Sequence, residues 1–163
     1  MANTHFKNQT LQKYLDQLAS REPVPGGGSA AAITSALGAG LISMAVHYSL
    51  GKGKSQVIEK RMRAILKTSE TIRKRLLELS EIDSRAYLNL MKSWKKGGAA
   101  ARQAKTKARQ APQEVCRLSA RAVALAPFLV LHGNPHLLSD VQVAIELLLA
   151  GFSSAAVMVK INQ

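Results

Sequence analysis

The sequence is poor in the residues that build disulfide-bonded and sheet-rich proteins. Its 163 residues include a single cysteine, Cys116, and aromatic residues make up only 4% of the chain. One cysteine excludes an intramolecular disulfide framework, and together with the lack of a signal-peptide pattern it predicts a cytoplasmic protein. No stretch alternates polar and apolar residues for long enough to propose a β-sheet.

Acidic residues are also scarce: 10 of them face 23 lysines and arginines, which gives a formal net charge of +13. Between residues 52 and 109, seventeen bases face five acids. This excess indicates either a solvated helical surface or a polyanionic partner, such as nucleic acid, an anionic membrane or a small molecule with several carboxylates. Only Tyr87 and Trp94 lie among these bases, so we do not expect a nucleic-acid partner.

Apolar residues make up 47% of the chain and recur mostly with the spacing of α-helices. The spacing predicts an all-α bundle of about five main helices, over residues 10–19, 29–48, 55–94, 99–128 and 139–159. Pro112 predicts a kink or interruption in the fourth of them. We expect a single domain over residues 1–163, in which residues 1–9 form a flexible N-terminal tail.

The second and fifth predicted helices have little polar surface and come close to the length that spans a bilayer. However, Gln142 and Glu146 interrupt the fifth, and the second is rich in Ala, Gly and Ser rather than in Leu and Phe. We therefore predict that both lie in the core or in a dimer interface, and we expect no membrane partner.

Three short patterns that could carry chemistry fail on their context. GKGKS at residues 51–55 ends like a phosphate-binding loop, but Tyr48 stands where the first glycine is needed and no strand precedes it. His132 and His136 are four residues apart, but Gly-Asn-Pro between them predicts a turn, so we expect no metal site. Cys116 is interpreted as a small buried residue, with a nucleophile as the alternative.

The stretch EPVPGGGSAAA at residues 22–32 allows two interpretations. In the structural one, the prolines end the first helix, the glycines turn the chain and Ser29 caps the second helix. In the chemical one, the glycines present unpaired N–H groups at a helix N-terminus to an anion or a carbonyl oxygen. Three glycines exceed what a cap requires, which favours a ligand.

The stretch GNPHLLSDVQ at residues 133–142 is also open to two interpretations. Asn-Pro initiates a turn, and Ser139 followed by Gln142 is typical of a capping box. Asp140 then lies in the first helical turn, where the helix dipole favours a carboxylate. Asp83, within its predicted helix, has an equally plain interpretation as a solvated carboxylate.

Seven patterns follow one another from Leu11 to the end of the chain: LQKYLDQLAS, PVPGGGSAAA, ALGAGLISMAVHYSLGK, IDSRAY, QAPQEV, GNPHLLSDVQVA and VKINQ. Together they resemble the cyclodeaminase/cyclohydrolase family of folate enzymes. The resemblance implies an all-helical bundle that dimerises and binds folate near the glycines and close to the subunit interface. It also implies that a tetrahydrofolate derivative, with its glutamate tail, is the substrate and that no prosthetic group is bound.

The resemblance implies that the enzyme is either a methenyltetrahydrofolate cyclohydrolase or a formiminotetrahydrofolate cyclodeaminase. Its catalytic carboxylates would be Asp140, as the first choice, and Asp83. The substrate-binding residues would be Pro25, Gly26, Gly27, Gly28, Ser29, Asn134 and Ser139. The alternative is a non-catalytic basic helical protein of the same fold, which binds nucleic acid or an acidic partner.

Overall fold

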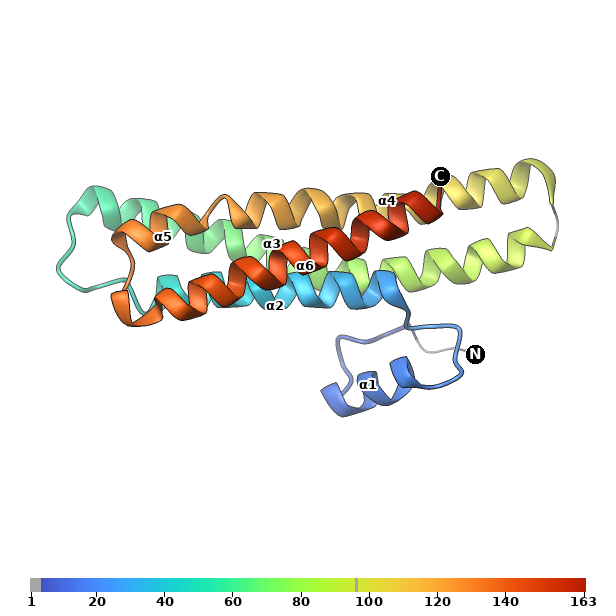
Figure 1. Ribbon diagram of the computed structural model, residues 1–163, viewed down its shortest axis with the longest axis horizontal. Coiled ribbons are helices and arrows are strands. Elements are labelled where there is room, and N and C mark those ends of the chain that lie inside the picture. Colours follow the sequence, from blue (N-terminus) through green and yellow to red (C-terminus); the bar gives the residue numbers. More distant parts are fainter. Residues whose placement is uncertain (1–3, 96) are drawn as a thin grey trace.

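The computed structural model describes residues 4–95 and 97–163 and confirms the all-α prediction, because it contains no strand within these ranges. The elements are α1 Leu11–Ala19, α2 Gly27–His47, α3 Gln56–Trp94, α4 Gly98–Val123, α5 Ala126–His132, the 3-10 turn η1 Pro135–Leu137, and α6 Leu138–Ile161. Figure 1 shows α2, α3, α4 and α6 side by side in an elongated bundle, with α1 set apart from it. Each of these four helices packs mainly against two of the others, in the cyclic order α2, α3, α4, α6, and α2 also contacts α4.

The helix boundaries follow local chemistry at several points. α1 and α3 begin where the sequence predicts, because Thr10 and Ser55 cap them by accepting backbone N–H groups of Lys13 and Ile58. The interruption predicted at Pro112 is wrong, since α4 continues through this buried proline to Val123. The helix is interrupted at Ala124 and Leu125, and α5 follows with Pro127 in its first turn. A proline is well placed at a helix start, which explains the position of the break.

The capping roles predicted for two serines are wrong. α2 already begins at Gly27, with Gly26 as its N-cap, so Ser29 lies inside the first turn. α6 begins at Leu138, directly after η1, so Ser139 is helical and no side chain caps this helix. The glycines before Ser29 therefore form the start of a helix rather than a turn.

The core is built where α2 meets α3 and α6. Ile42, Leu76 and Leu148 are fully buried in one continuous apolar cluster. α2 and α6 approach closely because glycines stand at their crossing: a Cβ at Gly38 would lie 2.7 Å from Cγ of Leu148, and one at Gly151 would overlap the Ser35 hydroxyl. The small residues of α2 thus serve close helix packing, as their abundance in the sequence predicts.

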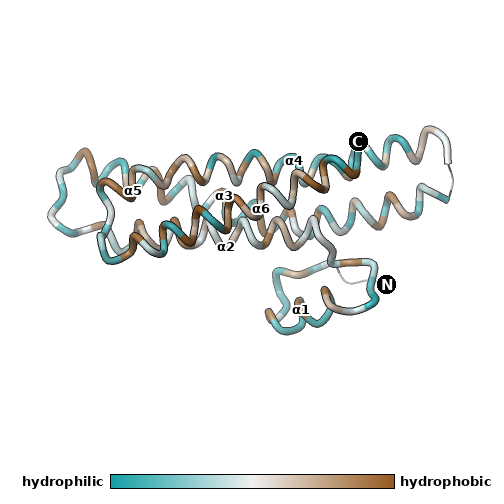
Figure 2. The backbone as a smooth tube through the Cα atoms, in the orientation of Figure 1, coloured by the Kyte–Doolittle hydropathy of each residue, from teal (hydrophilic) through white to brown (hydrophobic). Residues whose placement is uncertain are grey.

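Three helical stretches among the described residues are long and apolar enough to cross a membrane, judged by length and composition alone: Gly27–His47, Gly98–His132 and Pro135–Ile161. The first is mostly buried inside the bundle, whereas the third keeps much of its surface exposed. Figure 2 shows apolar residues along much of α6 and polar ones along the loop between α2 and α3. The absence of a membrane partner stays a prediction.

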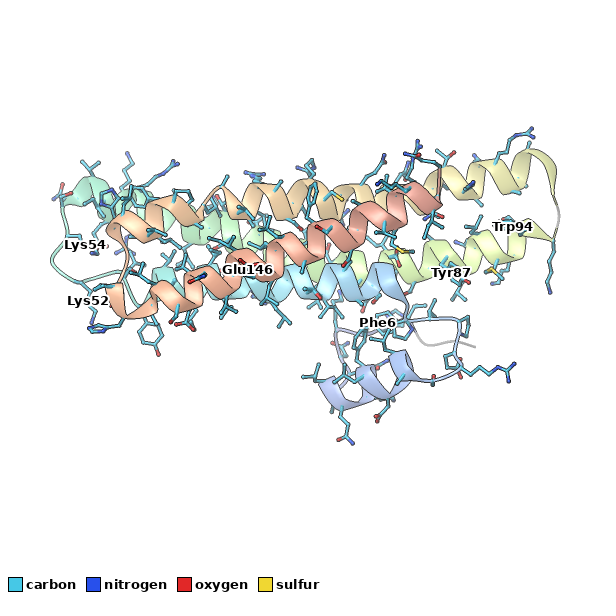
Figure 3. All side chains as sticks on the ribbon, in the orientation of Figure 1. Phe6, Lys52, Lys54, Tyr87, Trp94 and Glu146 are labelled. Carbon is cyan, nitrogen blue, oxygen red and sulfur yellow. The ribbon has the colours of Figure 1, made fainter. Side chains whose placement is uncertain are left out.

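Residues 4–9 of the predicted flexible tail contact the rest of the protein, while residues 1–3 lie outside the described part. Phe6 is only 5% exposed and packs edge-on against Tyr14, with ring centres 5.4 Å apart. The backbone N–H of Lys7 donates a hydrogen bond to Oε1 of Glu81 in α3, at 3.1 Å. Figure 3 places Phe6 between α1 and the N-terminal end of α2. Residues 4–9 are therefore packed against the fold.

Candidate active site

A cavity of about 270 Å³ opens where the N-terminus of α2 meets the other long helices. Three of its sides come from the glycine stretch, from α3 and from the end of α6. Its lining residues are Pro23, Val24, Gly26, Gly27, Gly28, Asp83, Tyr87, Ala108, Met158, Ile161 and Asn162. Asp83 is the only carboxylate among them, so it dominates the charge of this cavity.

Asp83 lies directly against the backbone of α2. A Cβ at Gly28 would overlap the Asp83 carboxylate, so this position must be glycine for the two helices to meet as they do. The backbone N–H of Ser29 donates a hydrogen bond to the same carboxylate. An acid at a helix N-terminus is stabilised by the free N–H groups and the helix dipole, which accounts for its place here.

The surroundings of Asp83 change its acidity. Burial raises the pKa of this carboxyl from 3.8 to about 6, and the hydrogen bond from Ser29 offsets only part of that rise. A carboxyl with a pKa near 6 is present in both protonation states close to neutral pH. Asp83 can therefore accept a proton or donate one, as general acid–base catalysis requires.

The predicted glycine-loop residues divide into two groups. Gly26, Gly27 and Gly28 line the cavity, and added methyl groups at Gly26 and Gly27 would meet open space or an ordinary contact with Met158. Pro25, which follows a cis peptide bond, and Ser29 are buried behind this lining. The three glycines thus leave room in the cavity, while the residues that flank them support it.

The other predicted site residues lie at the opposite end of the bundle. The backbone N–H of Asn134 donates to Oγ of Ser49 at 2.9 Å, and its side-chain oxygen accepts from the N–H of His136 at 3.1 Å. Asn134 lines a second cavity, of about 350 Å³, together with Ser49, Lys52, Lys54, Gly133, Pro135 and His136. Ser139 and Asp140 follow at the start of α6 and line neither cavity.

The two ends are too far apart for one chain to combine them. Asp140 and Met158 are both in α6, and a helix rises 1.5 Å per residue, so about 27 Å separates them along the axis. Met158 lines the cavity of Asp83. Figure 3 likewise shows Lys52 and Lys54 at the end opposite Tyr87 and Phe6. Within a single chain, Asp83 and Asp140 do not form one site.

Sequence reasoning missed the wall of the cavity that comes from Tyr87, Met158, Ile161 and Asn162. A signal was present, because Tyr87 ends the stretch IDSRAY and VKINQ contains Ile161 and Asn162. Nothing in the linear sequence, however, indicates that these two stretches meet beside the glycines.

The other candidate chemistries gain no support from the described residues. Residues 4–95 and 97–163 contain no group of three or more His, Cys, Asp or Glu that could hold a metal ion. Cys116 is partly buried, and its thiol lies 3.6 Å from the backbone oxygen of Phe152, to which it donates. Burial raises the pKa of this thiol, which disfavours the reactive thiolate.

Comparison with known proteins assigns the chain to a family. A family model described as formiminotransferase-cyclodeaminase matches residues 10–163, nearly the whole chain. The chain belongs to the formiminotransferase-cyclodeaminase family. It is 34% identical to the methenyltetrahydrofolate cyclohydrolase of Methylorubrum extorquens, over 95% of this chain and 79% of that protein. This result confirms the resemblance inferred from the sequence motifs.

Members of the family differ in length. The formimidoyltransferase-cyclodeaminase of Rattus norvegicus is 31% identical over 94% of this chain, but the chain spans only 30% of that protein. Among solved structures, the formiminotetrahydrofolate cyclodeaminase of Thermotoga maritima superposes with a TM-score of 0.92. It is 28% identical, over 96% of this chain and 79% of that one.

Proposed function

We propose that this protein is a folate-dependent one-carbon enzyme that acts on methenyl- or formiminotetrahydrofolate. The observation that carries the proposal is the Asp83 carboxylate, held against the glycine backbone of α2 in a cavity, with its pKa raised to about 6. The names of the related proteins in Methylorubrum extorquens and Thermotoga maritima support this substrate class.

The same carboxylate serves either reaction. In the cyclohydrolase, Asp83 accepts a proton from the water that attacks the methenyl carbon and passes it to the ring nitrogen. The bond between that nitrogen and the carbon then breaks, while the new hydroxyl releases its remaining proton to solvent and becomes the formyl oxygen. In the cyclodeaminase, a folate nitrogen attacks the formimino carbon and loses its proton to Asp83. Asp83 then gives this proton to the amino group on that carbon, and the bond between the carbon and the amino group breaks as ammonia leaves. In both, the negative charge stabilises a cationic carbon between two nitrogens.

We further propose that the enzyme is a homodimer whose subunits pair through α2 and α6. A groove of about 510 Å³ is almost wholly apolar and is lined by Ile33, Ala36, Leu37, Gly40, Leu41, Met44, Arg73, Leu77 and Leu147. Leu37 is 59% exposed at the midpoint of α2, and Val143 is 50% exposed on α6. Such an exposed apolar face favours association.

An antiparallel pairing about Leu37 would solve the problem of distance. A two-fold axis at the middle of α2 places the cavity of Asp83 in one subunit beside the cavity of Asn134 in its partner. The partner's Asp140, Ser139 and Asn134 would then face the cavity of Asp83. This arrangement gives all of the predicted site residues one location.

The basic surface has a proposed role in binding the glutamate tail of the folate. Residues 84–113, which cover the projecting ends of α3 and α4, contain eight lysines and arginines and no acid. A groove of about 490 Å³ between these helices is lined by Ile82, Arg85, Ala86, Asn89, Lys92, Ser93, Ala100, Gln103, Ala104, Lys107 and Gln110. We expect this surface to attract the carboxylates of the tail. We further propose that the enzyme is cytoplasmic and has neither a membrane nor a nucleic-acid partner.

An absorbance assay tests the proposal, because the methenyl compound absorbs differently from its precursor and its product. The protein is mixed with formiminotetrahydrofolate in one experiment and with methenyltetrahydrofolate in another. We expect faster appearance of the methenyl form in the first or its faster loss in the second. No acceleration in either, together with salt-sensitive binding to polyanions, would support the non-catalytic alternative instead.

A further inference from the structure

The N-terminal arm, defined as residues 4–19, is attached to the bundle at two points that flank Asp83. At the first, the hydroxyl of Tyr14 lies 3.1 Å from Oγ of Ser29, on the first turn of α2. At the second, the backbone N–H of Lys7 donates to Glu81, two residues before Asp83 in α3. Tyr14, Ser29 and Glu81 are all at most 5% exposed. The first attachment is therefore buried, and the second is partly buried.

Ser29 joins the arm to the carboxylate. Its hydroxyl meets Tyr14, while its backbone N–H donates to Asp83. A continuous chain of contacts thus runs from Phe6 through Tyr14 and Ser29 to Asp83. Apolar packing by Leu11 and Leu15 of α1 does little to hold the arm in place, because these side chains are 70% and 50% exposed.

We propose that Tyr14 is a positioning residue that holds Asp83, through Ser29, in the orientation needed for proton transfer. The role in proton transfer rests on the proposed function, whereas the contact of Tyr14 with Asp83 through Ser29 is a property of the protein without substrate. Tyr14 does not line the cavity, so it would act without touching the substrate.

Tyr14 is an ionisable group that interacts with Asp83 from outside α2 and α3, because the charge of Asp83 contributes to the pKa of Tyr14. Among the residues that line the cavity, only Tyr87 can ionise besides Asp83, and the remaining ones from α2, α4 and α6 cannot. Glu81 is engaged by Lys7 and lies 3.7 Å from Arg85. Burial raises the pKa of Tyr14, and the charge of Asp83 adds to that rise, so the phenol stays neutral and keeps its proton.

Removal of this hydroxyl should change the acidity of Asp83. Without the Tyr14 hydroxyl, the buried hydroxyl of Ser29 loses its hydrogen-bond partner. The backbone N–H of Ser29, which donates to the Asp83 carboxylate, is then free to shift. A carboxylate that loses a hydrogen-bond donor becomes harder to ionise, so its pKa rises. The acid limb of the pH–rate profile should move to higher pH with it.

The test compares Tyr14→Phe with Tyr48→Phe, a matched change on an exposed tyrosine at the far end of α2. For Tyr14→Phe we expect kcat to fall about tenfold at neutral pH, KM to change less, and the acid limb to move up by about half a unit or more. In Tyr48→Phe the pKa of Asp83 in the free protein should match that of the parent. Carbon-13 NMR of the Asp83 carboxyl, without substrate, should show the same rise in pKa.

The NMR titration separates this inference from the proposed function. An unchanged Asp83 titration in Tyr14→Phe overturns the positioning role, whatever the activity. A shifted titration in a protein that does not act on folate supports the link and overturns the proposed function. If Tyr14→Phe does not fold, Ser29→Ala removes the same hydrogen bond from the other side, and the same rise in pKa is expected.

Discussion

The two ends of the bundle use the same residue type in different ways. At one end, Asp83 is enclosed by glycine backbone and apolar side chains, and burial raises its pKa to about 6. At the other, Asp140 lies in the first turn of α6, near a cavity that contains Lys52, Lys54 and His136. The surroundings therefore distinguish a carboxylate suited to proton transfer from one suited to binding or charge. On this basis we place Asp83 ahead of Asp140 as the proton-transfer group.

The largest effect should come from Asp83→Asn, which keeps the size of the side chain but removes its charge and its proton acceptor. We expect kcat to fall by about 10²–10⁴-fold, as is typical when a general acid–base group is lost. Steady-state kinetics with methenyltetrahydrofolate measures the loss, and a cooperative melting curve with a midpoint no lower than that of the parent shows that the fold is intact. A kcat close to that of the parent would exclude Asp83 as the proton-transfer group.

Asp140→Asn should lower turnover less than Asp83→Asn, by about ten- to a hundredfold, if Asp140 only stabilises charge or places the substrate. Mixing the two variants then tests whether the site is shared between subunits. Random pairing makes half of the dimers mixed, and each mixed dimer has one intact site of two, so about a quarter of the parent activity should return. Sedimentation should show that the parent and both variants are dimers, and no recovery despite subunit exchange would contradict the antiparallel arrangement.

The buried carboxyl also predicts a pH dependence of stability. Its pKa is about 6 in the folded protein against 3.8 ordinarily, so between these pH values the folded state binds more protons. This group's contribution is therefore present below about pH 4 and is lost as the pH rises through 6, a difference of about 3 kcal/mol. Asp83→Asn should gain stability relative to the parent at pH 7.5 and lose that gain near pH 4. Urea unfolding of the parent and of Asp83→Asn at both pH values measures the difference.

Substitutions at the glycines test whether the folate contacts the backbone in the cavity of Asp83. Gly27→Ala meets only an ordinary contact with Met158, so we expect a near-normal melting curve but weaker folate binding, by about tenfold. Gly28→Ala overlaps the Asp83 carboxylate and should lower turnover and stability together. Calorimetric titration with folate and thermal melts distinguish the two. Equal folate affinity in Gly27→Ala and the parent would mean that the ligand does not approach this backbone.

The smallest effect should come from the basic surface. We expect longer glutamate tails to tighten binding a few-fold at low salt, and added salt to remove most of this gain, because exposed charges are screened. Replacing Lys92 and Lys107 with glutamine should remove the dependence on tail length, whereas the same changes at the exposed Lys60 and Lys67 should not. Equal affinity for short and long tails would leave the charge of residues 84–113 without this role.

Local rules predicted much of the fold. Thr10 and Ser55 cap helices where they were expected to, and the glycine stretch, Asp83 and the 133–142 stretch stood out as candidate site segments. The same rules failed at Ser29 and Ser139, because each can form the expected cap only if the helix begins there. The backbone of the preceding residues already follows a helix in both cases. The break between α4 and α5 was misplaced for a similar reason, since this stretch contains two prolines, Pro112 and Pro127, and only Pro127 lies at the start of a helix.

Sequence by itself determined that this chain is helical, strongly basic and a member of a folate enzyme family, because periodicity, charge and ordered motifs are all linear properties. Only the tertiary structure decided that Asp83 meets Gly28, that Tyr14 reaches Ser29, and that Met158, about 27 Å from Asp140 along α6, lines the cavity of Asp83. These relations depend on how helices that are distant in sequence pack against one another. The pKa of Asp83 follows from that packing, because burial acts on the carboxyl only after α2 and α3 have come together.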